Sequence, residues 1–135
     1  MRRLTASIAA AALVLSMAGI AGARPAETYA GLWEGDTSQG KLVTFRVNDS
    51  GKLTKFRIKF DIEGSSCVLH TTALWTGSRS IRNDHFRIHI DDLDGAATFV
   101  GDFVRRNKAE GTFKGTSNVI SGCAGRVSGT WVARR

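Results

Sequence analysis

The chain of 135 residues carries 19 basic and 12 acidic side chains, a formal net charge of +7. Without Arg2 and Arg3, which we assign below to a leader, 17 basic side chains face 12 acidic ones, and the net charge is +5. A chain of this length argues for one domain with one core and excludes a multidomain protein. The moderate basic charge favours anionic partners without requiring them.

The N-terminus has the pattern of a cleaved signal peptide. Arg2 and Arg3 form a basic start, residues 4–20 are apolar, and Ala21-Gly22-Ala23 is a small-x-small cleavage sequence. The apolar run of about 17 residues is at the short limit for crossing a membrane. We therefore expect a signal peptide over residues 1–23 and a single domain over 24–135, exported to the periplasm or the outside, with no membrane span after cleavage.

The rest of the chain alternates apolar and polar residues with a period of two, the pattern of half-buried strands. Polar turn sequences at 48–51, 91–95 and 105–108 separate several of these segments. Strands are expected around residues 29–35, 43–47, 56–62, 68–74, 86–90, 97–103, 109–115 and 127–133. No segment after the leader has helical periodicity. The sequence therefore predicts an all-β domain of about eight antiparallel strands in an up-and-down meander.

A glycine precedes an aromatic residue by two positions on four of these segments. The aromatic residues of the four pairs are Trp33, Phe103, Phe113 and Trp131. Residues two apart lie on one face of a strand, so each ring stands beside a glycine. Repeated glycines let a sheet curl, and neighbouring rings cover them. This favours closure to a small β-barrel with these four aromatics as structural core, the alternative being a β-sandwich.

Two cysteines, Cys67 and Cys123, are present in a chain predicted to be exported. An even number of cysteines in that context predicts a disulfide. Two isolated cysteines, 56 positions apart in the sequence, argue against a metal site.

Two resemblances arise at these residues. Gly31 and Trp33 on the first strand, with Arg134 or Arg135 ending the last, resemble the pattern of lipocalins and related calycin barrels, which implies a tryptophan plugging the closed end under an arginine. Over most of the mature chain, the Thr37-Ser38-Gln39-Gly40 turn, the two cysteines and the Gly129-Thr130-Trp131 ending resemble small secreted β domains of bacteria. That resemblance implies the fold and export but no activity.

A basic face is the main candidate for binding. If Phe45 pairs with Phe56, then Arg46 lies opposite Lys55, and Arg57 and Lys59 continue the same face. Like charges opposite each other are mildly unfavourable, so the side chains either splay into water or hold an anion. Because the aromatics fall on the other face and the chain is predicted to be exported, we expect an anionic envelope polymer or protein surface as partner, and no nucleic acid.

Catalytic chemistry finds little support. No serine stands in a G-x-S-x-G elbow. His85 and His89 are about 13 Å apart along a strand, too far to share a metal ion. Asp91, Asp92 and Asp94 resemble part of a calcium loop, but a polar turn explains them equally well. We expect no catalytic residues, metal or cofactor.

The functional prediction is thus a monomeric binding or interaction module. Two alternatives stay open: a small hydrolase with a site built from loops, and a lipocalin-like carrier of a small apolar ligand.

Overall fold

The computed structural model describes residues 29–92, 94–118 and 123–135. The predicted signal peptide and the first residues of the predicted domain, 24–28, lie outside these ranges. The described chain forms eight strands: β1 (Gly31–Thr37), β2 (Leu42–Val47), β3 (Lys52–Glu63), β4 (Val68–Ser80), β5 (His85–Asp92), β6 (Gly95–Arg105), β7 (Lys108–Ser117) and β8 (Gly125–Arg134).

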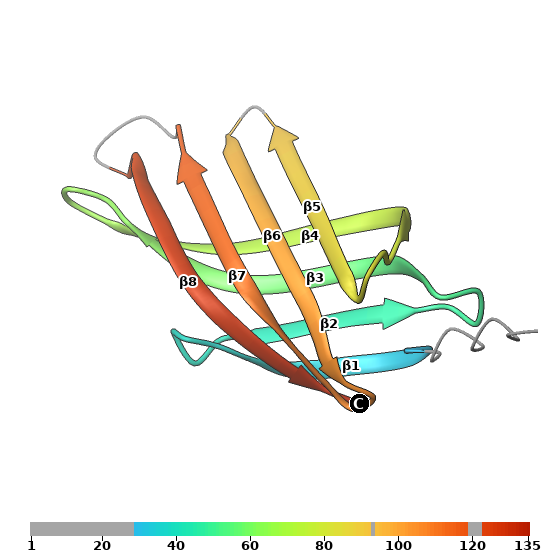
Figure 1. Ribbon diagram of the computed structural model, residues 1–135. Coiled ribbons are helices and arrows are strands. Elements are labelled where there is room, and N and C mark those ends of the chain that lie inside the picture. Colours follow the sequence, from blue (N-terminus) through green and yellow to red (C-terminus); the bar gives the residue numbers. More distant parts are fainter. Residues whose placement is uncertain (1–28, 93, 119–122) are drawn as a thin grey trace, which may run out of the picture.

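The strands form one antiparallel sheet that curls into a nearly closed barrel, which confirms the predicted fold class. The order across the sheet is β4-β3-β2-β1-β8-β7-β6-β5, so the first strand pairs with the last. In Figure 1 the half made of β5–β8 lies across the half made of β1–β4, and the halves join along β1 and β8. The opening of the barrel therefore falls between β4 and β5, two strands that are consecutive in the chain.

Alternating strand directions give the barrel two ends. The β2–β3 and β4–β5 turns lie at the end that also carries Tyr29 and Arg135, which we call the terminal end. Asn48 organises the β2–β3 turn, where its Oδ1 accepts hydrogen bonds from the backbone N–H groups of Ser50 and Lys52. In the β4–β5 turn, Asn83 and its neighbour adopt positive φ angles, as tight two-residue hairpins require.

Aromatic rings fill the interior. Trp33, Phe45 and Trp131 are each at most 1% exposed. Phe45 lies between the two tryptophans, 5.5 Å from the Trp33 ring and 5.7 Å from the Trp131 ring, measured between centroids. Phe45 separates the two indoles because the β1–β8 register places Trp131 opposite Thr37, four residues further along β1 than Trp33.

Trp33 closes the terminal end of the barrel. Its Nε1–H donates a 2.8 Å hydrogen bond to the carbonyl oxygen of Tyr29, so burial leaves no unsatisfied donor on this ring. The guanidinium of Arg135 lies 5.6 Å from the ring centroid, within cation–π range, and donates to the carbonyl oxygen of Ala30. The Tyr29 ring stacks on Phe103, and its hydroxyl donates to Asp84 at 2.7 Å.

Trp131 depends on glycines for its position. A Cβ atom at Gly111 would lie 2.7 Å from the Trp131 ring, and one at Gly101 would lie 2.8 Å from it. Carbon atoms do not approach so closely without displacement, so the indole occupies space that only glycine leaves free. This is the ring-over-glycine arrangement that the sequence pattern predicts.

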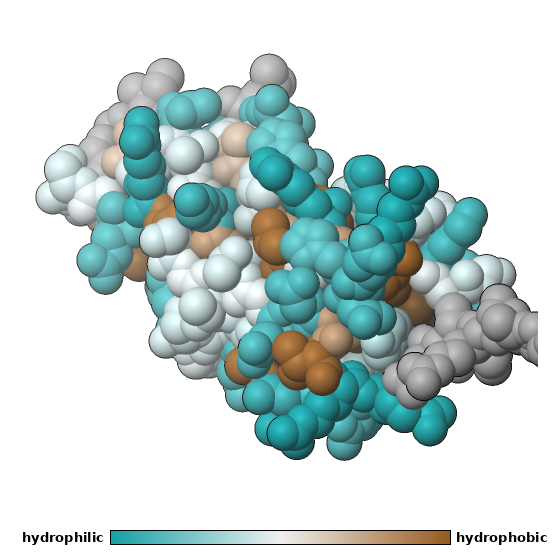
Figure 2. All heavy atoms as spheres, in the orientation of Figure 1, coloured by the Kyte–Doolittle hydropathy of each residue, from teal (hydrophilic) through white to brown (hydrophobic). Residues whose placement is uncertain are grey.

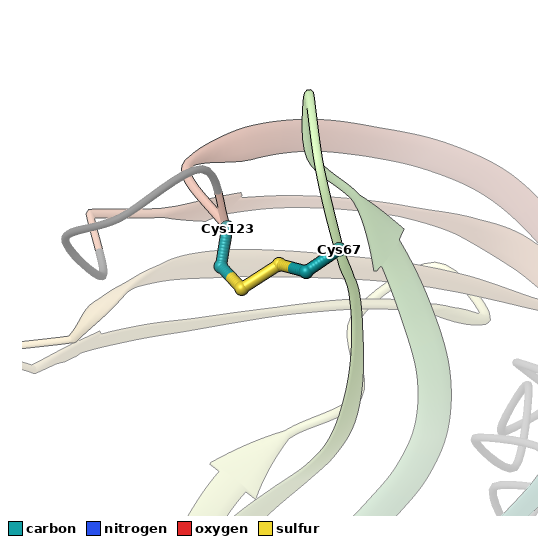
Figure 3. The surroundings of a disulfide bond; sticks show 2 residues. All are labelled: Cys67 and Cys123. Atoms are coloured by element: carbon teal, nitrogen blue, oxygen red, sulfur yellow. A yellow bond between two sulfur atoms is a disulfide. The ribbon is translucent and has the colours of Figure 1, made fainter.

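The opposite end, which we call the disulfide end, is bridged by the bond between Cys67 and Cys123 (Figure 3). Cys67 belongs to the β3–β4 turn, and Cys123 precedes β8. Their Cα atoms are 5.3 Å apart although 56 positions separate them in the sequence. The bond therefore joins the two halves of the sheet at this end and confirms the predicted pairing.

Truncation of Trp33 should be costly, because its whole ring is buried. For Trp33→Ala we expect a loss of about 3–5 kcal/mol in the free energy of unfolding, measured by denaturant titration. Leu32→Ala is the matched control, since Leu32 is the next residue on β1 and is 53% exposed; its effect should stay within about 0.5 kcal/mol. Equal effects of the two substitutions would contradict the interior role of Trp33.

Removal of the disulfide should destabilise the fold, because the unfolded chain gains conformational entropy when the cross-link is absent. The chain-entropy model gives about 4 kcal/mol for a loop of this length. We expect the Cys67→Ser/Cys123→Ser variant to lose stability of that order in the same titration. Mass spectrometry after alkylation without reductant should find no labelled thiol on the native protein, and two labels would contradict the pairing.

Candidate functional site

The predicted basic face is formed by Arg46 of β2 and by Lys55, Arg57 and Lys59 of β3, all exposed. The register is the predicted one: Phe45 pairs with Phe56, and Arg46 stands opposite Lys55. Alternation places these cations on the outer surface because their neighbours Phe56 and Ile58 are buried. The strands therefore bring all four residues together.

The surroundings of the basic face are neutral on the side of β4. Lys55, Arg57 and Lys59 stand opposite Thr76, Leu74 and Thr72, respectively. Within the described part of the chain, no carboxylate oxygen lies within 4.0 Å of any of the four cations. Their positive charge is thus not offset by a short ion pair of the fold.

The turn between β1 and β2 contains Thr37, Ser38, Gln39 and Gly40, and each of these residues has a structural role in it. Thr37 Oγ1 accepts hydrogen bonds from the N–H groups of Gln39 and Lys41, and Gly40 has a φ of 69°. Ser38 binds Thr130 on β8 through both its backbone N–H and its hydroxyl oxygen. The side-chain amide of Gln39 donates a hydrogen bond to the Asp61 carbonyl oxygen and accepts one from the Asp61 N–H. At this point of β3 it therefore makes the hydrogen bonds that a neighbouring strand would make.

Asp61 is the centre of a charged cluster at the edge of the basic face. Its carboxylate lies 2.7 Å from Nδ1 of His70 and 3.3 Å from Nζ of Lys41. The hydrogen bond with His70 lowers the pKa of Asp61 most, desolvation opposes this, and the hydrogen bond and charge of Lys41 lower the pKa further. The cluster therefore offsets the negative charge of Asp61, which is the acidic residue of β3 closest in sequence to Lys59.

Each histidine faces a polar side chain across its hairpin. Nδ1 lies 2.7 Å from Asp61 for His70, 2.7 Å from Asp102 for His85 and 2.8 Å from Thr98 for His89. Sequence reasoning missed these pairs, although counting outward from the hairpin turns would have found them. Over the described residues, no group of three histidine, cysteine or acidic side chains is placed to hold a metal ion.

The acidic β5–β6 turn has a structural explanation. Asp92 Oδ1 accepts hydrogen bonds from the N–H groups of Asp94 and Gly95, an Asx turn that uses the carboxylate locally.

The interior offers little space for a ligand. Ten buried aromatic side chains of the described residues occupy it: Tyr29, Trp33, Phe45, Phe56, Phe60, Phe86, Phe99, Phe103, Phe113 and Trp131. A cavity of about 90 Å³ lies near the disulfide end, below the gap between β4 and β5. Phe60, Leu69 and Ile90 are among its lining residues.

The outer surface over β5–β8 is mainly hydrophilic, with small separate hydrophobic areas (Figure 2). Val104 and Val132 are among the exposed apolar residues of this half. Single exposed apolar side chains are normal on a protein surface and identify no site.

Comparisons with protein-family models, with curated proteins and with solved structures found no significant match to this chain. In the ranges 29–92, 94–118 and 123–135, no helix has the length and apolar character needed to cross a membrane.

The lowered pKa of Asp61 predicts a defined contribution to acid unfolding. A carboxylate whose pKa is depressed by folding stabilises the fold above its unfolded pKa of about 3.9, and this contribution disappears as the pH falls through the folded value. We therefore expect Asp61→Asn to flatten the decline in the free energy of unfolding below about pH 4. Asparagine keeps the backbone bonds with Gln39, so only the charge changes.

Urea titrations from neutral pH down to about pH 2 measure this decline. Asp49→Asn serves as the control, because Asp49 is exposed in the turn between β2 and β3. Identical pH profiles for Asp61→Asn and the native protein would contradict the role of the cluster.

Proposed function

We propose that the chain is an exported binding module that holds an anionic partner on its basic face. The observation that carries this is the cross-strand array of Arg46, Lys55, Arg57 and Lys59, exposed and without a carboxylate within 4.0 Å in the described structure. Opposed like charges cost free energy in the absence of a partner. An anion bound between the strands would remove that cost.

The spacing of the basic face suits a repeating polyanion or an acidic protein surface. Lys55, Arg57 and Lys59 lie on one strand at intervals of about 7 Å and span about 13 Å. Each exposed pair with an anion is worth only about 0.2–1 kcal/mol. Useful affinity therefore needs several contacts at once, which favours a polymer or a protein surface over a small ion.

The aromatic interior supports a function on the outside of the barrel. Phe45 and Phe56, which lie directly beneath the basic face, are at most 1% exposed and are unavailable for stacking on bases. The same packing argues against the alternative of a carrier with a ligand in the barrel centre. Arg135 over Trp33 supports the likeness to calycin barrels as a way of closing one end.

Export rests on the disulfide and on the leader-like N-terminal sequence. A structural disulfide persists in oxidising compartments such as the periplasm or the extracellular space. We propose that the protein acts there as a monomer, with the basic face directed to an anionic envelope component.

Charge reversal tests the proposal. For Arg57→Glu/Lys59→Glu we expect the Kd for a soluble polyanion such as dextran sulfate to rise by about tenfold, because loss of two surface pairs amounts to about 1.4 kcal/mol. The effect should shrink as salt screens the exposed charges. Isothermal titration calorimetry at several salt concentrations measures both.

Lys114→Glu/Arg126→Glu is the matched control, since it changes net charge equally with exposed residues of β7 and β8. Equal weakening by both variants would mean that only net charge matters and would contradict a site on β2 and β3.

A further inference from the structure

Two strands of the barrel have one neighbour instead of two. In the described structure, β4 pairs with β3, β5 pairs with β6, and β4 and β5 meet only at the Arg82–His85 bridge beside their turn. From that bridge toward the disulfide end, both strands present a free edge. A free edge carries unpaired N–H and C=O groups that can accept a further strand.

The hydrogen bonds of neighbouring residues show which groups of β4 are free. The N–H of Gly64 donates to the carbonyl of Cys67, and Asp61 directs its N–H and carbonyl away from β4 to Gln39. Because antiparallel pairs alternate, every second residue of β4 bonds to β3 and the others point outward. The backbone groups at Val68, His70, Thr72, Leu74 and Thr76 therefore face the open side.

The free edge of β4 lacks the usual protection against strand pairing. From Val68 to Thr76 it contains no lysine, arginine, aspartate, glutamate or proline, and Val68 and Leu74 are 51% and 53% exposed. Natural edges are normally blocked by such residues or covered by other elements. The edge of β5 is different, because Arg87 and Asp91 point outward there.

A cavity lies beneath this edge and suits a side chain from an added strand. It measures about 90 Å³ and is lined by Leu69, Thr71 and Ala73 of β4 and by Ile90 of β5, among others. Thr71 Oγ1 is buried and has no hydrogen-bond partner among the described residues. An added strand alternates its side chains, so one of them would point into this cavity.

The other end of the opening is strongly basic. Arg79, Arg82 and Arg87 surround a groove of about 430 Å³ where β4 and β5 diverge from their turn. No described carboxylate forms an ion pair with these arginines, whereas the nearby His85 is paired with Asp102. Arginine is well suited to bind carboxylates through two parallel hydrogen bonds.

We propose that the free edge of β4 binds an extended acidic segment of a partner protein as an additional strand. The segment runs antiparallel to β4, so its N-terminal acidic residues meet Arg79 and Arg82 and an apolar residue further along enters the cavity. Strand addition of this kind draws affinity from main-chain hydrogen bonds and specificity from side-chain pockets. A second copy of this chain fits less well, because it would bring the same arginines and a basic net charge.

A labelled synthetic peptide tests the proposal by fluorescence polarisation. The peptide has two N-terminal glutamates followed by alternating threonine and valine. We expect saturable binding that weakens by about tenfold for Thr72→Pro, because proline removes an outward N–H at the centre of the edge while the ladder to β3 remains. Thr72→Val, which keeps the N–H, should bind like the native protein, and thermal unfolding shows whether each variant is folded.

Four further controls, two protein variants and two altered peptides, make the result specific. Arg79→Glu/Arg82→Glu should weaken binding several-fold, and Arg57→Glu/Lys59→Glu should weaken it less, which separates this edge from the basic face. The peptide with glutamates at its C-terminus should bind more weakly, and the peptide N-methylated at alternate residues should not bind.

Four outcomes would overturn the proposal: no binding by the native protein, equal binding by Thr72→Pro, equal binding of the N-methylated peptide, or a concentration-dependent dimer that Thr72→Pro abolishes. The last would identify a second copy as the occupant of the edge. Unchanged polyanion binding by Arg57→Glu/Lys59→Glu would contradict only the basic-face proposal, because binding of the peptide to β4 is measured separately.

Discussion

The pairing of β1 with β8 is the contact on which the rest of the architecture depends. It is possible only because Gly35 lies against the main chain of β8, where a Cβ atom would stand 2.7 Å from Cα of Ala133. Any side chain at Gly35 would separate the two strands. Once the first and last strands are joined, β4 and β5 are the only edges left among the described strands, and both lie in the middle of the chain.

The packed aromatic interior limits which parts of the barrel are accessible to a partner. Phe45 contacts both tryptophans, so the closed end and the centre of the barrel form one packed unit. The two indoles differ: Trp33 Nε1 donates to Tyr29, whereas the buried Trp131 Nε1 has no hydrogen-bond partner among the described residues. An unsatisfied buried donor costs about 1–3 kcal/mol, which the burial of so large a ring offsets. An interior packed in this way leaves the outer faces and the open edge for binding.

Much of the fold could be predicted from the sequence because hairpin register follows from local pattern. Pairing Phe45 with Phe56 places Arg46 opposite Lys55, and burial of one face leaves no other register. The position of the opening could not be predicted in this way. The residues around Leu74 alternate like those of a paired strand, and whether β4 meets β5 depends on how far the two halves of the curled sheet diverge. The role of Gln39 was equally hidden, because its partner Asp61 is 22 positions away.

The basic face and the open edge of β4 are neighbours in the sheet, and the partners proposed for them share the same chemistry. Thr76, Leu74 and Thr72 lie between the cations of β3 and the free edge, so a strand added to β4 would lie one strand spacing beyond these residues. Its outward side chains would then stand about 10 Å from the row of cations on β3, across β4, close enough for attraction at moderate salt. With arginines at one end of the opening and cations on the adjacent face, the two proposals call for the same kind of partner, an acidic and extended one.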